Sequence, residues 1–199
     1  MPHITRAVEL SGLLAGDGKV YKIPVDTMTG ALSTIDIAHH EIHEGETYQI
    51  SHQGVKNDGQ TISAYLQTPN INTWAHILLN WSSGGAAFGR IYEAPTITAN
   101  TGTSAVAYNR NRNSANTSMV LNNATVPVAG ACSTDATKTG DGTIIYTEYA
   151  GAGKQEGAMA REDHEFILKQ NTKYLFEVES DAAGIQLSLN ITWYEEAND

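Results

Sequence analysis

The chain contains a single cysteine, Cys132, among its 199 residues. One cysteine cannot form a disulfide within the chain, so a disulfide-based scaffold is excluded. Stability is therefore expected from core packing or from association between copies, as is typical of a protein that folds in a reducing cytosol.

Basic residues are also scarce. The 12 Lys and Arg stand against 22 Asp and Glu, which gives a formal net charge of −10. A general nucleic-acid binder needs clustered cations to neutralise phosphates, and an anionic membrane surface attracts the same cations. The composition therefore argues against nucleic acid and membrane as partners.

Long apolar runs are absent, because no stretch approaches the roughly 18 residues of a membrane-spanning helix. Residues 1–6 lack the basic and then apolar layout of a signal peptide. We expect no export by that route, and synthesis in the cytoplasm.

The clearest pattern that is present lies at residues 185–194, where apolar and polar residues alternate as in a strand with one buried face. Residues 173–179 alternate as well, and 180–184 supply turn residues, so these two segments are predicted to form a hairpin. The Asp58–Gly59 turn predicts a second hairpin, between residues 47–52 and 61–66.

About eight to ten short strands, spaced about ten residues apart, are predicted along the chain. Gly, Ser, Thr and Asn punctuate them, and no convincing helix exceeds two turns. The predicted fold is all-β: an antiparallel β-sandwich, jelly-roll-like, in residues 39–199. Residues 1–38 are weakly patterned and are interpreted as an N-terminal arm or extra short strands.

The densest group of possible metal ligands is the run His-His-Glu-Ile-His-Glu at residues 39–44. The zincin motif would need histidine at position 44, where Glu44 stands. The neighbouring residues favour strand and turn, in which His39, Glu41 and His43 would line one side. Whether His39, His40 and His43 bind a metal stays open; no metal site and no cofactor are predicted.

No catalytic motif is complete. Residues 151–154, Gly-Ala-Gly-Lys, resemble a phosphate-binding loop, but Glu148 and Gln155 stand where that loop needs Gly and Ser or Thr. No nucleophile elbow surrounds Ser83, so no catalytic residue and no enzyme activity are predicted. Four aromatic residues of the strands fit either a sugar-stacking platform or the core: Tyr48, Tyr65, Trp74 and Trp81.

A polar segment interrupts the strand pattern and contains two arginines. In an acidic chain, these arginines offer planar donors for carboxylates or backbone carbonyls. Two interpretations stay open for it, a buried loop anchor and a contact with a partner. The candidate interface residues are Asn109, Arg110, Asn111, Arg112 and Asn113.

Several motifs resemble those of a group of tailed-bacteriophage virion proteins, and their order and rough spacing agree from about residue 40 to 195. They are Ile-His-Glu-Gly at 42–45, Trp-Ala-His at 74–76, Ala-Tyr-Asn-Arg-Asn-Arg-Asn-Ser-Ala at 107–115, residues 161–175, and Ile-Thr-Trp-Tyr-Glu at 191–195.

This resemblance implies a structural protein of the virion, made in the host cytoplasm, that decorates the capsid and stabilises the head. Its implied partners are the major capsid protein and further copies of itself, with a trimer favoured. The alternative function is a tail-associated or fibre module, a β-sandwich that binds a carbohydrate or receptor.

Overall fold

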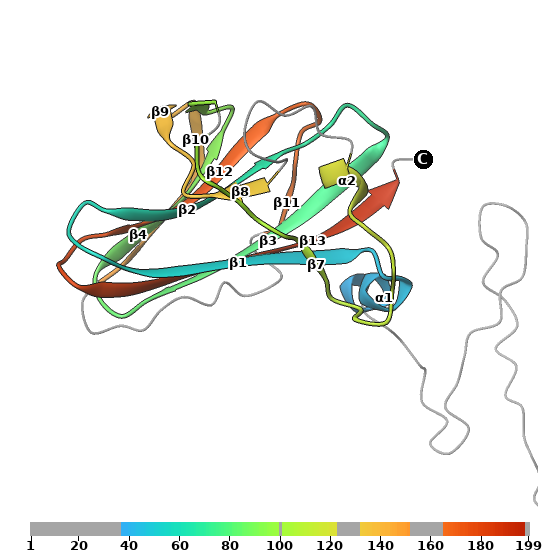
Figure 1. Cartoon of the computed structure of the whole chain (residues 1–199), viewed down its shortest axis with the longest axis horizontal. Helices are drawn as coiled ribbons and strands as arrows, with labels where there is room; N and C mark the ends of the chain where they lie inside the picture. The colour runs from blue at the N-terminus through green and yellow to red at the C-terminus, as the bar shows by residue number, and fades with distance from the viewer. Residues whose placement is uncertain (1–36, 100, 123–131, 152–164, 198–199) are drawn as a thin grey trace, which may run out of the picture. The chain divides into compact units, whose positions relative to one another are not determined.

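The computed structural model describes residues 37–99, 101–122, 132–151 and 165–197. The chain divides into two units, Met1–His40 and Glu41–Asp199. Residues 1–36, which are nearly all of the first unit and of the predicted arm or extra strands at residues 1–38, lie outside the described residues. The second unit contains every described strand (Figure 1).

One large sheet has five strands, each antiparallel to its neighbours. Its order is β11 (Glu165–Ile167), β3 (Thr73–Ser83), β13 (Ile185–Ala197), β1 (Thr47–Lys56) and β7 (Tyr108–Asn109). The central strand β13 pairs with β1 from Thr47↔Tyr194 to Lys56↔Ile185. The segment with the clearest alternation in the sequence is therefore the centre of this sheet.

The second large sheet has six strands, also antiparallel throughout. Its order is β10 (Thr143–Ala150), β4 (Ala87–Glu93), β12 (Lys173–Ser180), β2 (Thr61–Gln67), β8 (Cys132–Thr134) and β6 (Thr103–Ser104). The remaining elements are a two-stranded sheet, β5 (Thr96–Ile97) with β9 (Lys138–Gly140), and the helices α1 (Ile37–Glu44) and α2 (Met119–Asn122). Neither helix in the described part of the chain has the length and apolar character needed to cross a membrane.

The two sheets pack face to face, and the long strands follow the jelly-roll order. One sheet contains β11-β3-β13-β1 and the other β10-β4-β12-β2, so most successive long strands lie in different sheets. The predicted antiparallel β-sandwich is confirmed, and this strand order agrees with its jelly-roll character.

The two predicted hairpins are wrong, because β12 and β13 lie in different sheets, as do β1 and β2. Each turn instead connects a strand of one sheet to a strand of the other, and hydrogen bonds join the two turns. The Gly59 amide donates to the Ser180 carbonyl at 2.8 Å, and the Gly184 amide donates to Asn57 Oδ1 at 3.2 Å. Alternation identifies which face of a strand is buried, but it does not identify the neighbouring strand.

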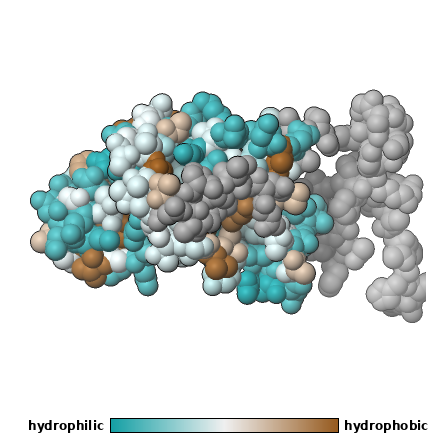
Figure 2. Space-filling view, turned by 45° about the horizontal axis from the view of Figure 1, so that its top comes forward, coloured by the Kyte–Doolittle hydropathy of each residue, from teal (hydrophilic) through white to brown (hydrophobic). Residues whose placement is uncertain are grey.

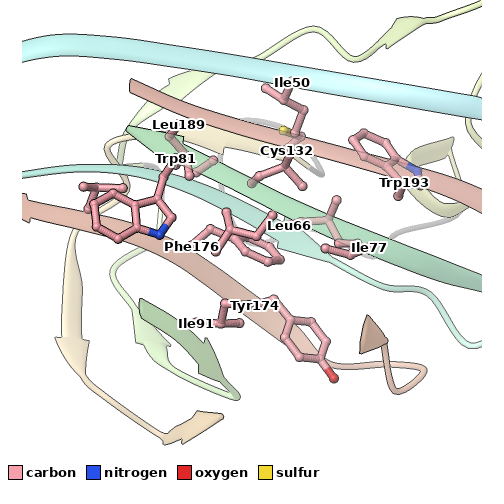
Figure 3. Packing of buried hydrophobic residues seen from close by; sticks show 14 of the residues in the cluster. Ile50, Leu66, Ile77, Trp81, Ile91, Cys132, Tyr174, Phe176, Leu189 and Trp193 are labelled. Atoms are coloured by element: carbon pink, nitrogen blue, oxygen red, sulfur yellow. The ribbon is translucent and has the colours of Figure 1, made fainter. Parts of the chain in front are cut away.

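The core lies between the two large sheets. Leu187, Leu189, Ile191 and Trp193 of β13 are fully buried in it, as the alternation predicted. Figure 3 shows Trp81 and Trp193 on opposite sides of the cluster, with Phe176 and Leu66 between them. The Trp81 indole lies against the backbone of Gly89 on β4, where a Cβ would overlap the ring.

A smaller hydrophobic cluster covers the opposite face of β12, where Leu175 points away from the main core. It contains Tyr65, Tyr92, Ile97, Ala136 and Leu175. Ile97 comes from β5, so the two-stranded sheet β5-β9 covers part of the outer face of the six-stranded sheet. Residues 119–122 form α2, not a strand, and its Val120 is packed into the main core.

The histidine-rich segment is helical, so the strand and turn predicted for residues 39–44 are wrong. Gly45 follows the helix with φ of 78°, and the Glu46 amide donates to the Glu41 carbonyl at 2.9 Å. This is the Schellman arrangement, which favours glycine because only glycine adopts the left-handed conformation without a steric cost. Gly45 in the sequence therefore indicates the end of a helix.

Candidate functional site

The polar segment with two arginines forms a loop at one edge of the five-stranded sheet; residues 108–116 are called the arginine loop below. The loop begins in β7, which pairs with β1 at Tyr48↔Asn109 and Gln49↔Tyr108. The Arg110 amide continues this pairing by donating to the Thr47 carbonyl at 2.8 Å. The sheet therefore holds the start of the loop in place.

Asparagine side chains of the loop bind the C-terminal end of α1. The amide groups of Asn109, Asn111 and Asn116 donate to the carbonyls of Gly45, His43 and Glu44, at 2.7, 3.0 and 3.3 Å. The last carbonyls of a helix have no partner within the helix, so these side chains supply the hydrogen-bond donors that the helix lacks. The loop is thereby attached to the end of α1.

Further bonds fix the loop backbone from within. The backbone amide of Asn111 donates to Asn109 Oδ1 at 2.8 Å, and the backbone amide of Asn113 donates to Asn111 Oδ1 at 3.1 Å. The Ser114 amide donates to the Asn111 carbonyl at 3.0 Å. Such local turns by asparagine restrict the backbone, so the loop is ordered before any partner binds.

The two arginines of the loop are exposed, and Arg112 Nη1 donates to the Asn109 carbonyl at 3.4 Å. The Arg112 guanidinium lies 5.5 Å from the centre of the Tyr108 ring, which is 54% exposed. Within the described ranges, neither Arg110 nor Arg112 forms an ion pair with a carboxylate. The two residues line a surface depression of about 350 Å³ together with Gln49, Tyr108 and Asn109.

The five candidate interface residues thus lie together but differ in what they do. Asn109 and Asn111 anchor the loop, whereas Arg110, Arg112 and Asn113 are exposed. The interpretation as a loop anchor therefore describes Asn109 and Asn111. The contact with a partner stays a prediction.

A second group of charges lies on the outer face of the six-stranded sheet; the charge network comprises Arg90, Lys138, Asp141, Glu177 and Glu179. Glu177 is 7% exposed and accepts a hydrogen bond from the Tyr92 hydroxyl at 3.0 Å. Its carboxylate lies 3.3 Å from Lys138 Nζ, and Arg90 Nη1 lies 2.6 Å from Glu179. Because Lys138 belongs to β9, the network attaches the two-stranded sheet to the outer face of the six-stranded sheet.

A histidine with two carboxylate neighbours lies on the outer face of the five-stranded sheet. His76 Nδ1 is 2.8 Å from Glu165 Oε1, and Nε2 is 3.7 Å from Glu196. The same Glu165 oxygen accepts from the Tyr194 hydroxyl at 2.6 Å, and the Tyr194 ring stacks on the imidazole. Since Glu165 is on the edge strand β11, these contacts fasten that short strand to the sheet.

Glu195 is a buried carboxylate without a cation partner among the described residues. It accepts hydrogen bonds from the Ser118 hydroxyl, from Trp193 Nε1 at 2.9 Å, and from the Met119 and Val120 amides at 2.7 and 3.3 Å. Burial raises the pKa of Glu195 above its ordinary value, and these bonds offset part of the effect. The carboxylate holds the first turn of α2 against β13.

Glu195 also lines a depression of about 530 Å³ that includes Glu46. Two carboxylates in a groove are the arrangement that glycoside hydrolysis requires, provided that both reach the substrate. Four hydrogen bonds already occupy the acceptor positions of Glu195, so it offers none to a substrate. This depression therefore does not supply the pair.

Other candidate groups are accounted for by the core. Tyr48, Tyr65 and Trp81 are buried, so only the half-buried Trp74 of the four aromatic residues reaches the surface. Burial raises the pKa of the Cys132 thiol to about 12, which leaves it protonated near neutral pH. In the ranges that the structure describes, no group of three or more His, Cys, Asp or Glu could hold a metal ion.

On the face drawn in Figure 2, hydrophobic residues form small separate patches among hydrophilic ones. Comparison with known proteins adds nothing to this geometry: no family model, no curated protein and no solved structure matches the chain.

Proposed function

We propose that the chain is a structural protein of a tailed-bacteriophage virion that decorates the capsid and stabilises the head. Its partners are the major capsid protein and further copies of itself, with a trimer favoured. It acts through contact area and requires neither a reaction nor a cofactor. Its location is the capsid surface, after synthesis in the host cytoplasm.

The observation that carries the proposal is the arginine loop. An ordered loop backbone presents two arginines and a tyrosine on a rigid sandwich, and interface contacts are rich in these residue types. The backbone is fixed before binding, so little conformational entropy is lost when a partner binds. The jelly roll is compatible with this role, since viral capsid proteins use it, although lectins use it too.

Antibody-gold labelling of intact virions tests the proposed location. Antibody raised against the purified chain is expected to place gold over the head. Gold confined to the tail or its fibres would overturn decoration of the head, and absence of gold from the particle would overturn every virion role. Virions disrupted before labelling serve as the control for epitopes hidden in the assembly.

A second candidate is a tail-associated or fibre module that binds a carbohydrate or receptor. Tyr149 of β10 is half exposed, its ring lies 4.6 Å from that of Phe88, and its hydroxyl donates to Asp181 at 3.1 Å. An exposed aromatic ring beside a carboxylate suits the apolar face and the hydroxyls of a sugar. Glycan titration followed by NMR at Tyr149 tests it, and unchanged signals across a glycan panel would remove it.

A further inference from the structure

We propose that the arginine loop binds a carboxylate-bearing segment of the major capsid protein, an inference that rests on the proposed function. The bound group is an Asp or Glu side chain, or a chain-terminal carboxylate. It enters the depression lined by Gln49, Tyr108, Asn109, Arg110 and Arg112.

The charges of the chain select an acidic occupant. The formal net charge is −10, yet Arg110 and Arg112 have no carboxylate partner in the described ranges, whereas Arg90 and Lys138 do. None of the described residues that line the depression is acidic. Two guanidinium groups that lack a carboxylate partner among the described residues are thus available to a carboxylate from another chain.

The geometry suits a carboxylate more specifically than a general anion. Guanidinium groups present parallel N–H donors that match the two oxygens of a carboxylate. The Tyr108 ring supports the Arg112 guanidinium, which keeps this planar group in place. A nucleic-acid backbone would need many more cations than these two to neutralise its phosphates.

Binding to capsid shells that lack this protein tests the proposal. The full chain, the R110Q/R112Q variant and the R110K/R112K variant are each sedimented with the shells over a range of concentrations. The glutamine variant is expected to bind at least about tenfold more weakly, because both charged contacts are lost. The lysine variant is expected to bind with intermediate affinity, since it keeps the charge and loses the paired donors.

A matched control separates the site from overall charge. The K56Q/K173Q variant also removes two positive charges, but at half-buried lysines outside the loop. It is expected to bind shells as the unchanged chain does. Equal weakening of both glutamine variants would contradict a local site. Circular dichroism of each variant, with a melting curve, verifies that it is folded.

A peptide titration tests the carboxylate site without the shell. Hexaglutamate peptide, with hexaglutamine as control, is added to the full chain while NMR follows Tyr108 and the arginine Nε signals. We expect hexaglutamate to shift these signals and hexaglutamine to leave them unchanged. The shift of the Tyr108 signal should be lost in R110Q/R112Q.

The two assays separate failure of the inference from failure of the proposed function. If the unchanged chain binds shells and R110Q/R112Q binds equally well, the inference is overturned and decoration of the head stands. If the chain ignores shells but hexaglutamate shifts the loop signals, decoration and the capsid protein as the source of the carboxylate are overturned. If neither occurs, both proposals are overturned.

Discussion

The charge network and the arginine loop use arginine in opposite ways. Arg90 lies 2.6 Å from Glu179, with 18% of its side chain exposed, and the surrounding charges are paired. Arg110 and Arg112 are exposed and have no carboxylate partner among the described residues, while hydrogen bonds fix the loop backbone beneath them. The charge network attaches one part of the fold to another, whereas the hydrogen bonds of the loop fix its backbone and attach it to the end of α1, and its two arginines form no ion pair with a described carboxylate.

Of the variants that test this comparison, Glu177→Gln should cause the largest loss of stability. The substitution removes the buried negative charge that faces Lys138 at 3.3 Å and Arg90 at 3.9 Å, so the free energy of unfolding should fall by about 2 to 3 kcal/mol. Urea denaturation measures this change. Binding to capsid shells below the unfolding transition should be unchanged, and weakened shell binding would contradict the division of roles.

The Asn109→Ala variant should lower stability by about 2 kcal/mol, since the Gly45 and Asn116 carbonyls lose the hydrogen bonds that the buried side-chain amide donates. It should also weaken shell binding, because the loop loses its anchor. The matched control is Asn113→Ala, whose side chain is exposed and which should change stability by less than about 0.5 kcal/mol. Equal unfolding midpoints for the two variants would show that the loop is not anchored in this way.

The same substitution can be made in both regions, as Arg90→Gln in the charge network and Arg110→Gln in the arginine loop. The first should cost about 1 kcal/mol of unfolding free energy, because Arg90 is paired and mostly buried. The second should leave stability within about 0.5 kcal/mol and weaken shell binding instead. Thermal melting and shell sedimentation on both variants give the comparison, and the reverse ranking in either assay would contradict it.

The smallest effect is expected where a cation is paired but exposed. Lys169 is 71% exposed and lies 2.6 Å from Glu93, and its ammonium holds the pKa of that carboxyl below the ordinary value of 4.5. A lowered pKa means that the folded state favours the ionised carboxylate, so the stabilisation is present above pH 4.5 and is lost as pH falls through the folded pKa.

The Lys169→Gln variant should therefore lose less than about 0.5 kcal/mol at pH 7 and a smaller amount at pH 3. Urea denaturation at the two pH values measures the difference. A larger loss at the lower pH would have the wrong sign for this ion pair.

The sequence predicted the parts of the fold that depend on periodicity. The alternation at residues 185–194 identified the buried face of β13, and turn spacing identified a sandwich. The pairing partners could not be predicted, because a turn such as Asp58–Gly59 can join strands of one sheet or of two. The helix at residues 37–44 was missed, although Gly45 at its end carried a signal.

The sequence predicted which segment forms the candidate site, but not which of its residues anchor the loop and which are exposed. Unusual polarity marked residues 109–113, but the division between anchoring asparagines and exposed arginines depends on the end of α1, which is distant in the sequence. The buried carboxylates Glu177 and Glu195 were missed, since a charged residue in an alternating strand is expected to face solvent. Their partners come from β9 and α2, whose positions only the fold supplies.

The most direct test of the central claim is an electron cryo-microscopy reconstruction of capsid shells saturated with the chain. The account predicts the β-sandwich on the outer surface of the head, with residues 108–116 against the shell and Arg110 and Arg112 at carboxylates of the capsid protein. A head without added density, or bound copies whose arginine loop faces solvent, would contradict it.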